Sequence, residues 1–412
     1  MKLRQLICIF LPIYFSSKML WDNVPYVFKI FSYMCIIFAI LFALYQIKLK
    51  YNTLIIQIAF FIYCSYIVFN GMINENIHRF TQGIYQYIFF VCVLFVGLVF
   101  YNNVNLTNIF KLLAYFLFAI ALLSFVEFSQ KSYILGGTME AGHISWEGDF
   151  DLAFRTKVFT RSYLSHGVIL GLGVLINYYI YKRLKQKFFF FSSLTCYFAI
   201  FTTQSRGPLV ATTLATIFLL YNFNSFLRKK VFIIFIPIII LIGFIILSDF
   251  NTGNSLLDYY FHRVRSIFDW ESERSNVDRA FLWLTALEMF SNNILLGIGI
   301  CATGSWDPTW THSLTVTESG VLQRLVELGI LGFVIYYGFV ILLIKNIAKR
   351  IKYLPKEKVK ETLLCISCAI LILVDDCTLQ VTEEFMITFF LWFFMAIACR
   401  NTNIFEFKRS LA

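Results

Sequence analysis

Charged residues are scarce in this sequence. Asp, Glu, Lys and Arg make up 14% of its 412 residues, whereas 59% are hydrophobic. A soluble domain carries roughly 25% charged residues. Apolar runs near the ~20-residue length that crosses a bilayer recur throughout the chain. The shortage of charge therefore argues against an ordinary soluble domain and favours a bundle of membrane-spanning helices.

Several motifs of soluble enzymes are also missing. The sequence has no Walker A loop, no HExxH, no GxSxG and no histidine–cysteine cluster with metal spacing. No cofactor is predicted. The acids Asp375–Asp376 and Glu383–Glu384 flank the last predicted external loop, and a divalent ion between them stays an alternative. Most of the ten cysteines lie inside apolar runs, so we interpret them, the Cys365–Cys368 pair included, as small apolar side chains.

The apolar runs predict an all-α polytopic membrane protein with about twelve transmembrane helices. The chain is interpreted as a single integral membrane domain over 1–412, with no internal repeat. The basic Lys2 and Arg4 precede an apolar stretch without a cleavage site, which predicts a retained first helix. The predicted spans are 5–17, 24–46, 53–70, 84–101, 107–128, 159–181, 189–204, 206–222, 231–248, 321–344, 362–374 and 384–399.

The positions of the basic residues predict the orientation of these spans. Lys and Arg cluster in the loops on one side, including the segment from Lys345 to Lys360 with its seven basic residues. By the positive-inside rule this side is cytoplasmic, and both termini fall there. The net charge of +11 therefore reflects basic residues in cytoplasmic loops. No nucleic-acid partner is predicted. The location that follows is a bacterial inner membrane, crossed many times.

Two long segments are predicted on the periplasmic side, over residues 129–159 and 249–320. Long loops without a repeat or a low-complexity signature are usually functional. The second loop lies between the ninth and tenth spans. It contains amphipathic stretches such as Arg279–Phe290, which predict short helices on the membrane surface. We therefore expect a functional site on this face.

Arg206 is the first candidate for that site. It lies in a short turn between two apolar runs, where an arginine is costly and usually faces a polar cavity. Gly207 favours a tight turn, and Pro208 suits the first turn of a helix. The planar guanidinium could hold a phosphate, and the alternative is an arginine that reaches to the membrane interface.

The long loop offers further candidates. Arg265 and Arg279 could contact an anion, although neighbouring acids make a solvated charged surface an alternative for any one of them. Glu318 and His312 precede the tenth span, and either could be a general base that deprotonates a sugar hydroxyl. The segment Glu318–Gly320 could instead cap the helix, and Arg324 could pair with Glu327 three residues later.

Three pieces of this sequence resemble the Wzy/WaaL superfamily of O-antigen polymerases and ligases. Thr203-Gln-Ser-Arg206-Gly resembles the family's T-Q-[ST]-R turn. Arg279, Trp283 and Ala286 before the Asn293–Gly299 stretch resemble R-x3-W-x2-A and its glycine segment. Glu327-Leu-Gly-Ile-Leu-Gly332 resembles the E-x-G-x-x-G helix start. Together the pieces cover about Thr203–Gly332.

The resemblance implies metal-independent glycosyl transfer with inversion. The donor would be an oligosaccharide linked to undecaprenyl diphosphate, and arginines would hold the diphosphate. Carried over by motif, Arg206 and Arg279 become the diphosphate contacts. Fixed cations there would stabilise charge on the leaving group without a nucleotide or a metal. Membrane lipids, and a chain-length regulator, are the further partners that this resemblance allows.

One departure separates the two activities of the superfamily. Ligases carry His-Asn nine residues before the family glutamate, and here that place holds Glu318-Ser319. Polymerases often have an acid followed by Ser or Asn. The sequence therefore favours a polysaccharide polymerase for O antigen or capsule, with Glu318 as the first choice of base and His312 as the second.

Two other functions stay open at the level of sequence. A ligase of the same superfamily would use lipid A–core as its acceptor. A polysaccharide-unit flippase or transporter would be a different class, and transporters often show repeated halves and charged helices near the midplane. Here almost all ionisable residues lie at loop ends.

Overall fold

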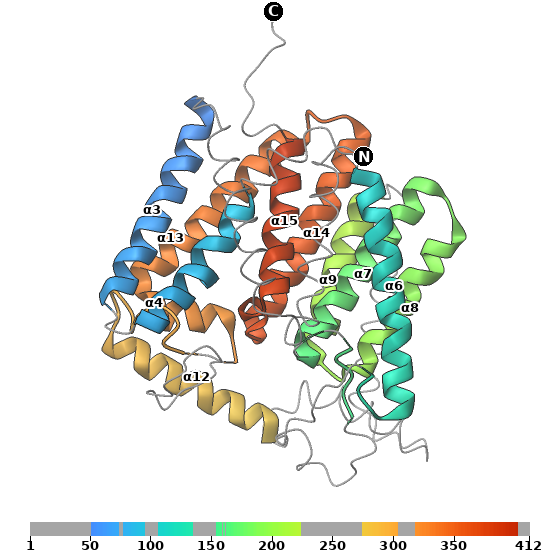
Figure 1. Cartoon of the computed structure of the whole chain (residues 1–412). Helices are drawn as coiled ribbons and strands as arrows, with labels where there is room; N and C mark the ends of the chain where they lie inside the picture. The colour runs from blue at the N-terminus through green and yellow to red at the C-terminus, as the bar shows by residue number, and fades with distance from the viewer. Residues whose placement is uncertain are drawn as a thin grey trace, which may run out of the picture.

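The computed structural model describes residues 51–73, 77–94, 106–134, 154–158, 160, 162–223, 274–303 and 318–402. All the regular structure in these ranges is helical (Figure 1). The elements are α3 (Tyr51–Ile73), α4 (Ile77–Gly83), the π-helix η2 (Ile84–Phe89), α6 (Leu106–Gln130), α7 (Tyr163–Leu184), α8 (Lys187–Thr202), α9 (Arg206–Phe223), α12 (Arg274–Asn292), α13 (Gly320–Ile351), α14 (Lys356–Thr378), the 3₁₀ turn η5 (Val381–Glu383) and α15 (Phe385–Asn401).

The helices coincide with the apolar runs. Helices α3, α6, α7, α8, α9 and α15 begin and end within a few residues of predicted spans. Helix α13 begins one residue before its predicted span of 321–344 and ends seven residues after it. Helix α14 is longer than its predicted span of 362–374, because a charged first turn precedes the apolar part. The predicted spans 5–17, 24–46 and 231–248 lie outside the described residues, and the count of twelve stays a prediction.

Length and composition identify the membrane-spanning part. Among the described helices, α6, α7, α13 and the Ile55–Ile73 part of α3 are long and apolar enough to cross a bilayer, and two shorter apolar helices accompany them. Large apolar side chains point outward, as in Phe61 and Phe191, each more than 60% exposed. Exposing such an apolar surface to water would cost free energy, whereas exposing it to lipid would not. The fold is that of a polytopic membrane protein.

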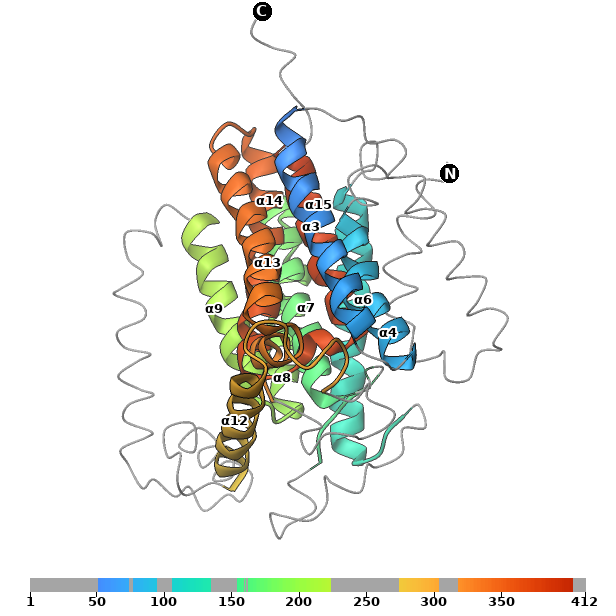
Figure 2. The same ribbon diagram turned by 90° about the vertical axis from the view of Figure 1, so that its left-hand side faces the viewer.

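Helix α7 forms the centre of one half of the bundle. It packs against α6, α8, α9 and α14, and it is buried over most of its length (Figures 1 and 2). Polar side chains join these helices where lipid offers no partner. Asn177 donates to the carbonyl of Ala114 at 3.4 Å, and the Ser193 hydroxyl donates to the carbonyl of Val174 at 2.9 Å. Such bonds hold apolar helices in register.

The two ends of the bundle differ. The connections α7–α8 and α13–α14 lie at one end, where Arg183 pairs with Glu361 at 2.7 Å (Figure 1). Helix α12 lies across the opposite end, close to the start of α13 (Figure 2). The basic segments 182–187 and 345–360 are therefore at the end of the bundle opposite the motif residues at the start of α13.

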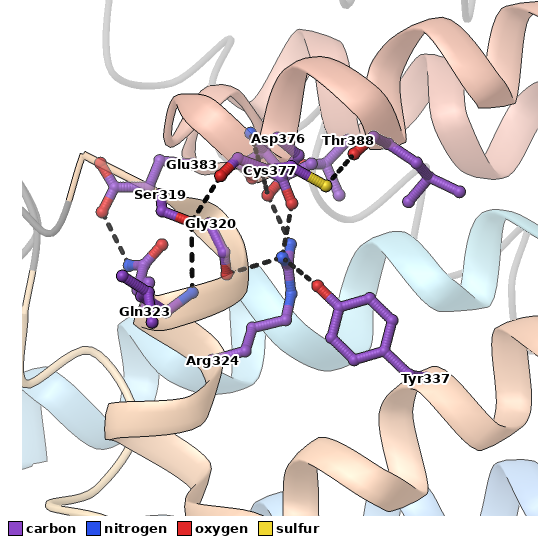
Figure 3. A network of polar contacts seen from close by, with 12 residues as sticks. Ser319, Gly320, Gln323, Arg324, Tyr337, Asp376, Cys377, Glu383 and Thr388 are labelled. Carbon is purple, nitrogen blue, oxygen red and sulfur yellow. Dashed lines mark hydrogen bonds and ion pairs between the residues drawn. The ribbon is translucent and has the colours of Figure 1, made fainter. Parts of the chain in front are cut away.

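A buried ion pair joins the start of α13 to the end of α14 (Figure 3). Arg324 Nη1 lies 2.5 Å from Asp376 Oδ2, and both side chains are almost fully buried. Arg324 also donates to the Gly320 carbonyl at 2.9 Å and to the Thr382 hydroxyl. Asp376 Oδ1 accepts from the backbone N–H of Thr382 at 3.1 Å. Every strong polar group in this cluster has a partner, which makes the burial of charge tolerable.

This pair is expected to be essential for stability. Asp376→Asn would leave the Arg324 guanidinium buried without its carboxylate, at a cost of about 3–5 kcal/mol. Thermal unfolding in detergent should show a clearly lower Tm. Glu357→Gln is the matched control in the same helix, because its ion pair with Arg183 is at the surface, where such pairs contribute little. Equal Tm values for the two variants would contradict this role of the pair.

Candidate functional site

Arg279 and Glu318 meet at the start of α13. Arg279 lies in the second turn of α12, and its Nε is 3.5 Å from Glu318 Oε2. The Arg279 side chain is 31% exposed and that of Glu318 is 28% exposed, so a ligand can reach both. The two residues are 39 positions apart in the sequence. The structure thus brings together a predicted diphosphate contact and the first-choice base.

Local backbone geometry places Glu318 at this position. Ser319 is the N-cap of α13, and its hydroxyl accepts from the Leu322 N–H at 3.4 Å and donates to the Cys377 carbonyl at 2.8 Å. The predicted cap is therefore confirmed for Ser319. Glu318 has φ of 49°, in the left-handed region that non-glycine residues rarely adopt. A functional position often carries such a conformation, because the surroundings must hold it.

Arg206 begins α9, as the turn chemistry predicts. The preceding helix ends at Thr202 with Thr203 as its C-cap, and Gln204 in the following turn has φ of 52°. Gly207 lies against the Asp375 side chain at the end of α14, where a Cβ would approach Asp375 Oδ1 to 2.5 Å. The next residue of α14, Asp376, packs on Gly320 at the start of α13, two residues after Glu318. Through the end of α14, the Arg206 turn and the Arg279–Glu318 pair therefore belong to one end of the bundle.

The hydrogen bonds of Glu327, the glutamate of the third motif, indicate a structural role. It is fully buried, and its Oε2 accepts from the Tyr87 hydroxyl at 2.6 Å and from the Cys301 N–H at 3.1 Å. Its Oε1 accepts from the N–H and hydroxyl of Thr303 at 3.1 and 2.8 Å. The interpretation that Arg324 pairs with Glu327 is wrong, because Arg324 turns to Asp376. Glu327 instead fixes the segment after α12.

The glycines of the second and third motifs contact each other. Gly329 interrupts α13 with φ of 63° and ψ of −176°. This break frees backbone groups, and the segment after α12 binds them: Gly299 N–H donates to the Glu327 carbonyl at 3.0 Å, and Ile330 N–H donates to the Ile294 carbonyl at 2.8 Å. A Cβ on Gly297 or Gly329 would collide with the other segment's backbone. Two motifs are therefore one packing unit that anchors α12.

The remaining predicted site residues are not all placed. His312 and Arg265 lie outside the described residues, as does the whole segment 249–273. The acids proposed for a divalent ion are arranged differently: Asp376 pairs with Arg324, and Glu383 accepts from Gln323 at 2.8 Å. Over the described ranges, no group of three or more His, Cys, Asp or Glu residues is arranged to hold a metal ion.

Sequence reasoning missed the role of α14 in this site. Asp375 and Asp376 appeared only as acids beside a loop, yet each packs on a glycine at the start of another helix. The available signal was the pair of acids at the end of an apolar run, where a charge usually has a partner or a function. The sequence did not indicate the partners of these two acids, because the partners are far away from them in the sequence.

The fold and this end of the bundle define a polytopic helical membrane protein with a cluster of arginines and acids at one face. A family model described as O-antigen ligase, Wzy_C, matches residues 188–337. No curated protein matches the chain. The family match confirms the resemblance to the Wzy/WaaL superfamily, whose members are membrane enzymes that resemble glycosyltransferases. The matched segment contains Arg206, Arg279 and Glu318, and it ends before Asp375.

The glycine contact in this unit is directly testable. Gly329→Ala would place a side chain against the Leu295 carbonyl in a strained backbone conformation, and we expect a loss of about 2 kcal/mol or more. The measurement is thermal unfolding in detergent. Gly338→Ala in the same helix is the control, since a Cβ there meets no neighbour within 4 Å. A normal Tm for Gly329→Ala would show that the break in α13 is not required.

Proposed function

We propose that this protein is a polysaccharide polymerase. It transfers a growing glycan from undecaprenyl diphosphate to a new lipid-linked repeat unit, for O antigen or capsule, at the periplasmic face of a bacterial inner membrane with both termini cytoplasmic. The observation that carries the proposal is the ion pair between Arg279, from the second motif, and Glu318, nine residues before the glutamate of the third motif. This pair lies at the end of the bundle opposite the basic loops. The family match supports the superfamily, and the residue pair Glu318-Ser319 favours polymerase over ligase.

In this proposal the arginines bind the donor. Arg279 and Arg206 hold the diphosphate, with Arg265 as a third contact from the same long loop. A diphosphate would compete with Glu318 for the Arg279 guanidinium, which offers several N–H donors in one plane. Binding of the donor would therefore release Glu318 from its ion pair. No nucleotide and no metal is required by this scheme.

In the transfer step, one bond to the anomeric carbon of the donor forms and another breaks. The hydroxyl oxygen of the acceptor sugar attacks the anomeric carbon at the reducing end of the donor glycan. The bond from that carbon to the diphosphate oxygen breaks, and the diphosphate keeps the electron pair. The acceptor proton moves to the Glu318 carboxylate, or to His312 if the histidine is the base. Arginines fixed beside the diphosphate stabilise the charge that develops on it.

The first experiment is a transfer assay in detergent. Purified protein receives a repeat unit linked to undecaprenyl diphosphate, without nucleotide and with a chelator, and the products are separated on a gel. We expect a ladder from the wild-type protein. Arg206→Ala, Arg279→Ala and Glu318→Gln should each reduce it by about 100-fold or more, because each removes a charge or base needed in the transition state.

The controls separate folding from chemistry. Each variant is compared with wild type by elution profile and Tm. Lys358→Ala, an exposed cation at the opposite end of the bundle, should leave the ladder unchanged. A ladder that survives in Glu318→Gln would assign the base to His312 or to another residue. Glycan transfer only after lipid A–core is added would make the protein a ligase, and movement of the lipid-linked unit across vesicles without transfer would make it a flippase.

A further inference from the structure

The basic segments 182–187 and 345–360 form one charged surface at the end of the bundle opposite the candidate site. All but one of their lysines are exposed, and Glu357 is the only acid within these described ranges. Arg183 joins the two segments, because its guanidinium pairs with Glu361 at 2.7 Å and with Glu357 at 3.5 Å. Lysines gathered without matching acids attract anions. The proposed transfer reaction uses none of these lysines.

Helix α13 places part of this basic surface on its lipid-facing side. Val334 and Ile341 are 59% and 61% exposed, and they lie on the face that lipid would cover. After Ile341, exposed lysines follow at steps of four, four and three residues, which is the spacing of one helical face: Lys345, Lys349 and Lys352. Lys345 lies about 6 Å beyond Ile341 along the helix axis. The apolar face of α13 therefore continues directly into a row of cations.

Helix α8 shows the same arrangement. Lys187 begins α8 and is exposed, and Phe191, one turn later on the same face, is 62% exposed. Tyr353, after α13, is 77% exposed, and the Lys352 Nζ lies 5.0 Å from the centre of its ring. Tyrosine is enriched where a membrane meets water, and lysine extends an apolar stem to reach the headgroups. Both helices thus combine an apolar lipid-facing side with cations at its edge.

Helix α14 carries an equal number of lysines without such an apolar face. Lys356, Lys358 and Lys360 are exposed, whereas no residue of α14 from Glu361 to Asp376 is. Packing against α7, α9, α13 and α15 buries this part of the helix. The lysines of α14 therefore lie next to a helix that has no lipid-facing side. The two groups of three lysines have the same charge and differ in what lies beside them.

We propose that Lys345, Lys349 and Lys352, together with Lys187, bind the anionic headgroups of phospholipids in the leaflet at this end of the bundle. Acyl chains that cover the apolar faces of α8 and α13 bring their phosphates to these cations. Neighbouring lysines at an anionic lipid surface add to its binding. A soluble acidic partner would not need apolar side chains beside the lysines. The inference does not depend on the proposed transfer reaction.

The test is a titration of the detergent-purified protein with phosphatidylglycerol, with the bound lipid counted by native mass spectrometry. Phosphatidylcholine, which has no net charge, is the control lipid. We expect the wild-type protein to bind phosphatidylglycerol more tightly, and high salt to weaken this binding because it screens the charges. The triple variant Lys345→Gln, Lys349→Gln, Lys352→Gln should bind phosphatidylglycerol about tenfold more weakly.

The triple variant Lys356→Gln, Lys358→Gln, Lys360→Gln is the matched control, because it removes the same charge from the same end of the bundle. Its affinity for phosphatidylglycerol should stay within about twofold of wild type. Elution profiles and Tm values without added lipid show that both variants fold. Equal losses in the two variants would mean general charge attraction and would overturn the inference. Equal binding of both lipids by wild type, or no loss in the α13 variant, would overturn it as well.

Discussion

The ion pair between Arg324 and Asp376 is the interaction on which the arrangement of the candidate site depends. It joins the first turns of α13 to the end of α14, and its hydrogen bonds extend to Thr382 in the turn before α15. In a membrane bundle, apolar contact alone gives little orientation, because lipid tails are as apolar as the helix surfaces. A compensated charge pair has one good geometry, so it fixes how these helices meet.

The start of α13, held by this ion pair, positions the candidate site. The start of α13 carries Ser319 as its cap and Glu318 in a left-handed conformation, and Glu318 reaches Arg279. Helix α12 can present Arg279 there because the segment after it is held at the break in α13. Glu327 and the glycines of two motifs make that attachment. The motif residues therefore divide into those near the partly exposed Arg279–Glu318 pair and those that anchor the segment after α12.

The two adjacent acids at the end of α14 differ in their partners. Asp376 has its charge compensated within the fold, whereas Asp375 packs against Gly207, next to Arg206, and its oxygens have no hydrogen-bond partner in the described part of the chain. Each acid packs against a glycine at the start of the facing helix, Gly207 for Asp375 and Gly320 for Asp376, where a side chain would not fit.

The sequence by itself determined the helical membrane fold, the approximate ends of the described helices and the resemblance carried by residues from Thr203 to Gly332. These features are local: an apolar run long enough to cross a bilayer, a turn made by Gly207 and Pro208, or a short motif can be read from neighbouring residues. The same local reading placed Arg206 at a helix start and Ser319 at a cap.

Only the tertiary structure decided which charges face one another. Arg324 pairs with Asp376, 52 residues away, and not with Glu327 on its own helix. Arg279 meets Glu318, and Asp375 meets Gly207, through contacts between helices that are distant in the sequence. A helical pattern gives the face on which a side chain lies, but the rotation and depth of each neighbour are set by packing and by the pairing of buried charge.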